Sequence, residues 1–302
     1  MQGSFWAATT DVIALDRRLT GVGRERSSLE GSPALSRGRP RPAVVLGVFF
    51  LSLYLLTMGG HLDSPDEELM FQVTRSLAER GSMDIGTAVS PEQLAQTGVD
   101  GRQYTHYGPV TSLLSVPFYD LGRAAAALMP PRYTDVVERF AVGLRDPLVS
   151  AAACVVFYAI AVDFGFGTAV AILLTLAFGA ATFVWPLVKY SWSEPVTGFW
   201  LLLSVYAAMR ALRTAPLKWS AISSIALGLA IGSKITTAVA APALLLFLVA
   251  GGPGSLRRRL ERGLPFGLIL LLPVIGIAIL NVVRFGNPLV TGYYMEGYLW
   301  HP

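Results

Sequence analysis

Two acidic residues that follow the first long apolar segment are the best-placed candidates for catalysis. They are Asp66 and Glu67, in the sequence His61-Leu-Asp-Ser-Pro-Asp-Glu-Glu. Ser64-x-x-Glu67 matches a capping box, so these acids also have an ordinary role at the positive end of a helix. The two interpretations are compatible, because Glu67 can cap the helix while Asp66 faces a substrate as a general base.

A second polar cluster, residues 100–109, contains His106 and Tyr107. The Asp100-Gly101 dipeptide predicts a turn. A single histidine in a loop is more often an ordinary hydrogen-bonding residue than a ligand-binding one. Because His106 and Tyr107 directly precede Gly-Pro and an apolar helix, they are also candidates for contact with a lipid head group.

A short polar loop between two apolar segments contains Lys189 and Glu194. Both residues can serve as interfacial anchors beside the aromatic Trp185, Tyr190 and Trp192. The alternative is substrate binding. Glu194 favours this alternative, because it opens an apolar segment directly before a proline.

Two cations, Lys234 and Arg284, lie at the ends of later apolar segments. Snorkelling toward the membrane surface explains each of them. The alternative is a pair of cations that binds an anionic lipid phosphate. The segment that follows Arg284 ends in Tyr293 and Tyr294, whose aromatic rings are typical of sugar contact.

The composition indicates what must position these residues. Of 302 residues, 53% are hydrophobic and only 15% are charged, against about 25% charged in an ordinary soluble domain. One cysteine and three histidines exclude a disulfide framework and a His-rich or Cys-rich metal site. A net charge of +4 is too small to indicate a nucleic-acid partner.

Apolar runs of about 20 residues, the length that crosses a bilayer, recur along the chain. The sequence therefore predicts an all-α, polytopic transmembrane bundle of about seven spans. The spans are Ala43–Gly60, Pro147–Ala161, Phe166–Val188, Pro195–Met209, Trp219–Ile231, Thr236–Gly251 and Leu264–Val283.

Charge distribution predicts the organisation around these spans. Residues 1–42 are a basic segment, expected to be disordered and cytoplasmic, and 43–302 form the transmembrane core with a first external loop at 61–146. Pro109–Met129 carries Asp120 and Arg123, each costing about 2.5–3.5 kcal/mol at mid-membrane, so we expect it not to cross. Of the 24 Lys and Arg residues, 14 then lie on the cytoplasmic side. All the candidate residues lie on the external side.

These motifs together resemble the bacterial GT-C superfamily of glycosyltransferases, including protein O-mannosyltransferases and lipid A aminoarabinose transferases. The similarity is carried by the acidic pair after the first span, DGRQYTHYGP, PFYDLG, the SEP loop, the Lys between spans, and RFGNP followed by GYY. It runs from about residue 43 to the end. The chain has Tyr-Gly-Pro where many members have Pro-Pro, and seven spans where they have eleven or more. We therefore expect a fragment or a minimal version of such an enzyme.

The resemblance implies an enzyme of the cell membrane that takes a sugar from a polyprenyl-phosphate donor and passes it to a glycan, lipid or protein acceptor on the external face. Asp66 occupies the place of the family's catalytic acid, and His106 that of a loop residue before a proline. Transfer would be an inverting single displacement, with Lys189, Lys234 or Arg284 stabilising the phosphate. No cofactor is required, and the sequence leaves open whether Asp63 and Asp66 share a divalent ion. Two alternatives stay open: a transporter, and a non-catalytic protein that binds the carrier lipid.

Overall fold

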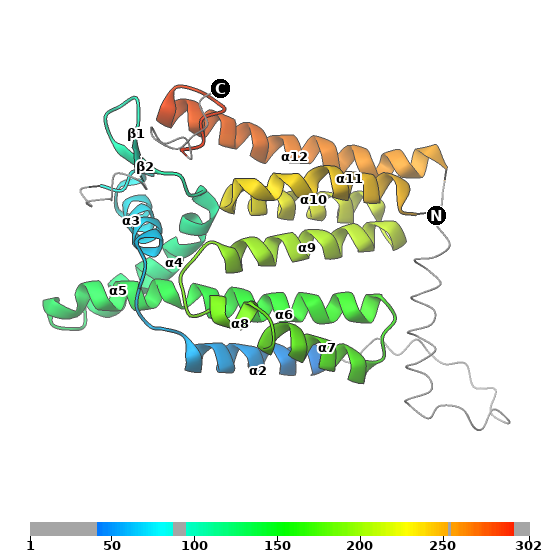
Figure 1. Ribbon diagram of the computed structural model, residues 1–302, viewed down its shortest axis with the longest axis horizontal. Helices are drawn as coiled ribbons and strands as arrows, with labels where there is room; N and C mark the ends of the chain where they lie inside the picture. The colour runs from blue at the N-terminus through cyan, green and yellow to red at the C-terminus, as the bar shows by residue number, and fades with distance from the viewer. Residues whose placement is uncertain (1–40, 87–94, 253–254, 293–302) are drawn as a thin grey trace.

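The computed structural model describes residues 41–86, 95–252 and 255–292, and the described chain is mostly helical (Figure 1). This agrees with the predicted all-α class, apart from one hairpin of two three-residue strands. The elements, with η marking 3₁₀ helices, are α2 (Arg41–Thr57), α3 (Pro65–Arg80), β1 (Ala95–Thr97), β2 (Gln103–Thr105), α4 (Pro109–Ala126), η1 (Pro131–Tyr133), α5 (Thr134–Gly143), α6 (Arg145–Asp163), α7 (Thr168–Ala180), α8 (Val184–Leu187), α9 (Glu194–Arg213), α10 (Pro216–Ser233), η2 (Ile235–Val239), α11 (Ala240–Ala250) and α12 (Leu256–Phe285).

Three helical stretches are long and apolar enough to cross a membrane: Pro131–Asp163, Glu194–Arg213 and Leu256–Phe285. The other predicted spans lie in helices that are shorter or less apolar, so the count of seven stays a prediction. Along α12, large apolar side chains such as Leu268, Leu272 and Ile279 are more than half exposed. A soluble protein rarely exposes such a continuous apolar surface, which is typical of a helix that faces lipid.

The predicted span Phe166–Val188 is not one helix. It divides into α7 and the single turn α8, separated by residues 181–183. At the break, the Thr182 hydroxyl donates to the carbonyl of Phe178 and accepts a hydrogen bond from the amide of Val184. A threonine side chain that satisfies the backbone in this way competes with helix continuation.

The bundle consists of two groups of helices (Figure 1): α2, α6 and α7 pack together, α9 to α12 form the second group, and α6 joins the groups through α9. Small residues permit close contact between helices, as is usual in membrane proteins. The Ser204 hydroxyl of α9 donates to the carbonyl of Ser223 on α10 at 2.8 Å. On the other face of α10, Gly228 lies directly against Pro273 of α12.

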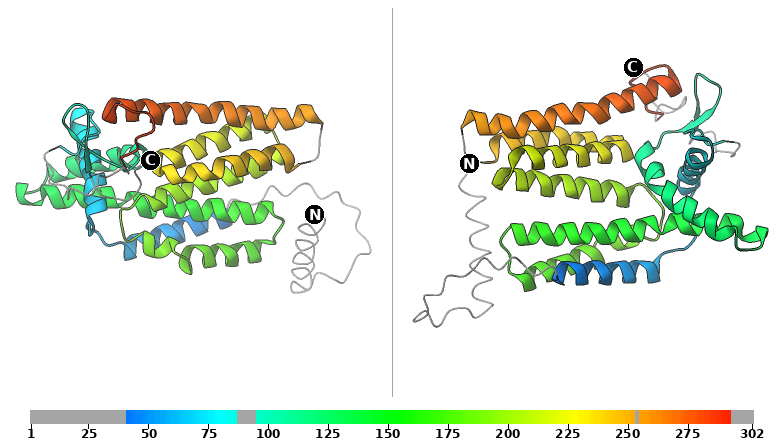
Figure 2. Two further views of the ribbon diagram at one scale, coloured as in Figure 1. Left: turned by 45° about the horizontal axis from the view of Figure 1, so that its top comes forward. Right: turned by 180° about the vertical axis from the view of Figure 1, so that it is seen from behind.

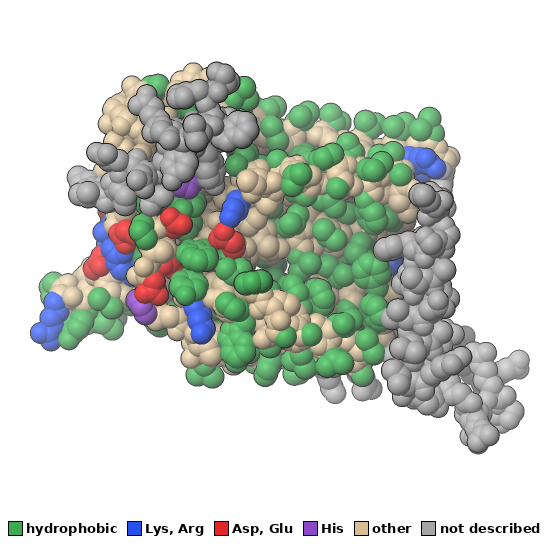
Figure 3. All heavy atoms as spheres, viewed as in Figure 1, with side chains coloured by type: hydrophobic (Ala, Val, Ile, Leu, Met, Phe, Trp, Pro, Cys, Tyr) green, Lys and Arg blue, Asp and Glu red, His purple; other side chains and the backbone are tan. Residues whose placement is uncertain are grey.

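The polar elements gather at one end of the bundle, which we call the α3 end. Helices α3, α4 and α5 and the hairpin lie there in every view (Figures 1 and 2). Because the long helices alternate in direction, α6 and α9 begin at this end, and α2, α7, α10 and α12 finish at it. Figure 3 shows acidic, basic and histidine side chains clustered at this end and apolar side chains along the helices.

Helix α4 packs against α3 and α5 at the α3 end, and it meets α10 only where α10 finishes. The side chains of Asp120 and Arg123 on α4 are both more than half exposed. This arrangement agrees with the expectation that Pro109–Met129 does not cross. Of the predicted basic segment 1–42, residues 1–40 lie outside the described residues, and residues 41–42 open α2.

We predict that Gly228→Ala destabilises the bundle. A Cβ at position 228 would lie 2.4 Å from Cγ of Pro273, and overpacking of this kind costs about 1–3 kcal/mol. The measurement is the thermal unfolding midpoint in detergent. Gly267→Ala on α12 is the matched control, because its Cβ would meet no atom within 4 Å, and alanine in a helix interior gains about 0.5–1 kcal/mol over glycine. Equal midpoints for the two variants would contradict the α10–α12 packing.

Candidate functional site

The first turn of α3 is fixed by the predicted capping box. The Ser64 hydroxyl accepts a hydrogen bond from the Glu67 amide, and Oε2 of Glu67 accepts from the amides of Ser64 at 2.7 Å and Asp63 at 2.8 Å. The second carboxylate oxygen, Oε1, accepts from the amide of Ser191 at 2.5 Å. Glu67 is only 1% exposed. It is therefore a structural anchor that also joins α3 to the loop before α9.

A buried ion pair that the sequence analysis missed supports this anchor. Arg145 and Asp146, at the start of α6, are both fully enclosed and form two hydrogen bonds of 2.9 and 2.7 Å. Arg145 also donates to the Ser115 hydroxyl on α4 and to the carbonyl of Trp192. The pair therefore connects α4, α6 and the loop before α9. In the sequence, this ion pair is indicated by two adjacent residues of opposite charge directly before an apolar segment.

Asp66 lies one residue before this anchor and has a different environment. Its side chain is partly exposed, and no hydrogen bond or ion pair to it is found in the part of the chain that the structure describes. The neighbouring Glu68 is bound by Arg139. Burial alone would raise the pKa of Glu68, but hydrogen bonds from Arg139 and Gln72 lower it below its usual value. Of the three consecutive acids, Asp66 alone is available to accept a proton from a ligand.

Two predicted binding residues, Glu194 and Lys234, form an ion pair with each other. Nζ of Lys234 lies 2.5 Å from Oε1 of Glu194, and the pair links the start of α9 to the end of α10. Both side chains are about one-third exposed. The charge of Lys234 is therefore balanced by Glu194, which weakens its case as the main phosphate ligand.

Arg284, by contrast, is buried without an acidic partner among the described residues. It is 6% exposed, and its Nη2 donates to Oδ1 of Asn281 at 2.9 Å. Its Nε is buried and has no hydrogen-bond partner within the described residues. His106 and Tyr107 line the same small cavity. The structure thus brings together three of the predicted binding residues.

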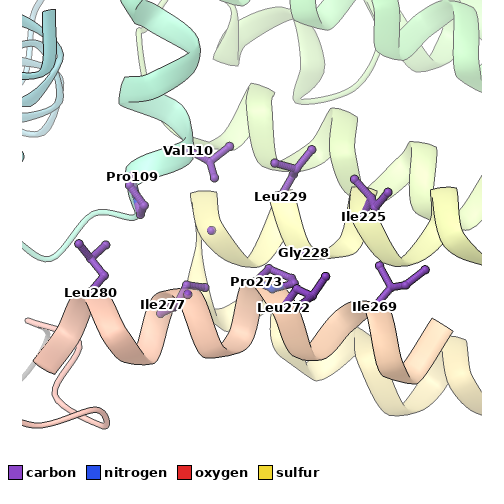
Figure 4. Close-up of a pocket in the computed structure, with 12 residues that line it drawn as sticks. Pro109, Val110, Ile225, Gly228, Leu229, Ile269, Leu272, Pro273, Ile277 and Leu280 are labelled. Atoms are coloured by element: carbon purple, nitrogen blue, oxygen red, sulfur yellow. The ribbon is translucent and has the colours of Figure 1, made fainter. Parts of the chain in front are cut away.

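An apolar groove adjoins the Arg284 cavity. It measures about 290 Å³, runs between α10 and α12, and is closed at one end by Pro109 and Val110 of α4 (Figure 4). Pro109, Gly232 and Ile277 line both the groove and the Arg284 cavity. The α10–α12 groove therefore adjoins the small cavity, of about 20 Å³, that Arg284 lines.

A second apolar groove, of about 440 Å³, lies between α6, α7, α8 and α9. Glu194 lines its end at the α3 end of the bundle. The charged residue that lines this α6–α9 groove is Glu194, which is paired with Lys234. The two grooves differ in the cation beside them. Arg284, beside the α10–α12 groove, has no acidic partner among the described residues, whereas Lys234, beside the α6–α9 groove, is paired with Glu194.

Tyr107 connects the Arg284 cavity to α3. It packs against the cluster formed by Leu69, Val73 and Ile85, and it also lines the cavity of Arg284. Asp66 precedes Leu69 by three residues and Val73 by seven, so the helical repeat places it on the same face of α3. Asp66 therefore lies on the side of α3 that packs against Tyr107.

The hairpin between α3 and α4 fixes the position of His106. Strands β1 and β2 pair antiparallel with Gln96 opposite Tyr104, around the predicted Asp100-Gly101 turn. The Tyr104 hydroxyl donates to Asp100 at 2.7 Å. Burial and this hydrogen bond raise the pKa of Tyr104 to about 12, and the same bond lowers the pKa of Asp100. The amide of Val99 donates to the carbonyl of Arg284, which ties the hairpin to α12.

The remaining predicted site residues are Lys189, Tyr293 and Tyr294, together with Asp63 as a candidate metal ligand. Lys189 is exposed, and among the described residues its side chain forms no ion pair. Tyr293 and Tyr294 lie outside the described residues. Asp63 is bound to His61, with 2.7 Å between Oδ1 and Nε2, and no group of three His, Cys, Asp or Glu side chains suited to a metal occurs in the described ranges.

Comparisons with family models, with curated proteins and with solved structures found no match to this chain.

We predict that Glu67→Gln destabilises the protein strongly, whereas Asp66→Asn costs no more than about 0.3–1 kcal/mol, the usual loss when a negative charge is removed from the first turn of a helix. An amide NH₂ in place of one carboxylate oxygen would face a backbone N–H donor, and an unmatched buried donor costs about 1–3 kcal/mol. Asp66 has no partner to lose among the described residues. Thermal unfolding of both variants in the same detergent measures the difference. A drop of equal size in both variants would contradict the division of roles between the two acids.

Proposed function

We propose that the chain is an integral-membrane glycosyltransferase that moves a sugar from a polyprenyl-phosphate donor to an acceptor at the α3 end of the bundle. In this proposal the chain crosses the plasma membrane about seven times, with the α3 end external. The observation that carries the proposal is the apolar α10–α12 groove, which adjoins the cavity lined by Arg284. A long apolar tail with a phosphate at its end is the ligand that fits both features.

The donor is assigned to the α10–α12 groove because of charge. Arg284 is a buried cation with no acidic partner among the described residues, whereas Lys234 beside the α6–α9 groove is paired with Glu194. Desolvating an unpaired charge is costly unless a counter-charge arrives. A phosphate at Arg284 supplies that counter-charge, and a guanidinium binds it in a bidentate manner.

The proposed reaction is a single displacement with inversion. The Asp66 carboxylate takes the proton of an acceptor hydroxyl as the hydroxyl oxygen attacks the anomeric carbon. The bond between that carbon and the phosphate oxygen breaks, and its electron pair stays on the lipid phosphate. Arg284 stabilises the released phosphate, so the leaving group needs no proton from a general acid.

Asp66→Asn is expected to lower sugar transfer by roughly 10²–10⁴-fold, the usual contribution of a general base, while binding of polyprenyl phosphate is retained. The assay is release of polyprenyl phosphate from a panel of polyprenyl-phosphate-linked pentoses, hexoses and aminopentoses by the protein in nanodiscs. Asp120→Asn, an exposed acid on α4, is the control and should retain full activity. Binding of polyprenyl phosphate by the wild type without transfer from any donor would favour the non-catalytic alternative.

Arg284→Lys is expected to weaken binding of polyprenyl phosphate at least tenfold, because loss of a charge-assisted hydrogen bond costs about 1.5–3 kcal/mol. Affinity is measured in nanodiscs by displacement of a fluorescent polyprenyl phosphate. Arg132→Lys, on the exposed η1 turn, should leave the affinity unchanged. Unchanged affinity in Arg284→Lys would remove the phosphate role from this residue and leave it as a helix anchor.

A further inference from the structure

A second arginine-lined cavity lies at the opposite end of the bundle, where α9 finishes and α10 and α12 begin (Figure 1). It measures about 350 Å³ and is lined by Arg213, Arg258, Arg262 and Glu261 together with residues 211–212 and 214–216. Blue basic side chains are visible at this end in Figure 3. This cavity is remote from the proposed transfer site.

Arg262 is the buried arginine of this cavity, whereas Arg213 and Arg258 are exposed. It is only 3% exposed, and its Nε and Nη2 have no hydrogen-bond partner within the described ranges. Its guanidinium lies against Gly252, where a Cβ would fall 2.4 Å from Nη1. The position is therefore shaped to admit the guanidinium, and two of its donors are left for a ligand.

The surrounding charges leave the cavity positive. Glu261 is neutralised by Arg257, whose Nε lies 2.9 Å from Oε1. Asp163 is paired with Arg210 at 3.2 Å. Arg213 donates to the uncharged backbone carbonyl of Asp163. Among the described residues, no acid therefore balances Arg213, Arg258 and Arg262.

An open apolar groove of about 920 Å³ adjoins the cavity. Leu217, Leu256, Leu260 and Leu264 line it, and it shares Ala215, Pro216 and Glu261 with the arginine cavity. Lys218 and Arg257 lie along the same groove. A ligand held here meets positive charge and exposed leucines together, so it must carry an anionic group and an apolar chain.

We propose that this end of the bundle holds an anionic phospholipid, with its head-group phosphate in the Arg213–Arg258–Arg262 cavity and an acyl chain in the leucine groove. A free phosphate would use the arginines but would leave the groove empty. The proposal does not rest on the transferase activity, since no residue of the proposed transfer site takes part. It assigns a regulatory or stabilising lipid to the face that the basic loops predict to be cytoplasmic.

The test is binding of short-chain phosphatidylglycerol to the full chain in detergent, measured by native mass spectrometry, with short-chain phosphatidylcholine and inorganic phosphate as separate probes. Wild type should bind phosphatidylglycerol at least tenfold more tightly than either other probe. Arg262→Met and the exposed Arg258→Met should each lose about tenfold in affinity. Because Arg258 is on the surface, its variant remains informative if Arg262→Met does not fold.

Arg259→Met is the matched control, because it removes the same charge from the same helix at a position that lines neither the cavity nor the groove. It should bind phosphatidylglycerol like the wild type. An equal loss in Arg258→Met and Arg259→Met would reduce the effect to general surface charge and overturn the site. Inorganic phosphate binding as tightly as phosphatidylglycerol would overturn the assignment to a lipid.

Discussion

The buried carboxylate of Glu67 determines how the polar end of this protein is built. A carboxylate that is 1% exposed must be bound on both oxygens, and here three backbone amides do so, two from the start of α3 and one from Ser191. The Arg145–Asp146 pair connects the same loop to α4 and α6. Because α3 is held at its first turn, the hairpin and α4, which follow it, are held against the ends of the long helices.

This anchoring separates the charged groups into those that stabilise the fold and those that are left for a ligand. Glu67, Arg145 and Asp146 are fully used in internal contacts, and Lys234 is neutralised by Glu194. Asp66 has no partner, and Arg284 no acidic partner, in the described part of the chain. A buried cation without a counter-charge is costly, so the structure is most readily explained if a bound anion supplies that charge. In the proposed function, this anion is the phosphate of a lipid whose apolar tail lies in the adjoining groove.

The local features of this arrangement could be predicted from sequence, and the long-range ones could not. The Ser64-x-x-Glu67 box and the Asp100-Gly101 turn depend on residues within four positions of one another. The Glu194–Lys234 pair and the contact of Arg145 with Ser115 join residues 40 and 30 positions apart, and charge and spacing give no sign of them. The i, i+3 spacing of Asn281 and Arg284 on α12 is a local sequence pattern that predicts their hydrogen bond. The number of spans stays a prediction, because several apolar helices are shorter than a membrane-crossing helix requires.

Photo-cross-linking tests the central claim most directly. The protein in vesicles would be irradiated with a polyprenyl phosphate that carries a diazirine on its first isoprene unit, and the labelled peptides would be sequenced by mass spectrometry. If an anionic lipid occupies the α10–α12 groove, the label falls near Val110, Gly232 and Ile277, and excess unlabelled polyprenyl phosphate prevents it. Labelling confined to the α6–α9 groove, or spread over the outer face of α12 and insensitive to competitor, would contradict the account.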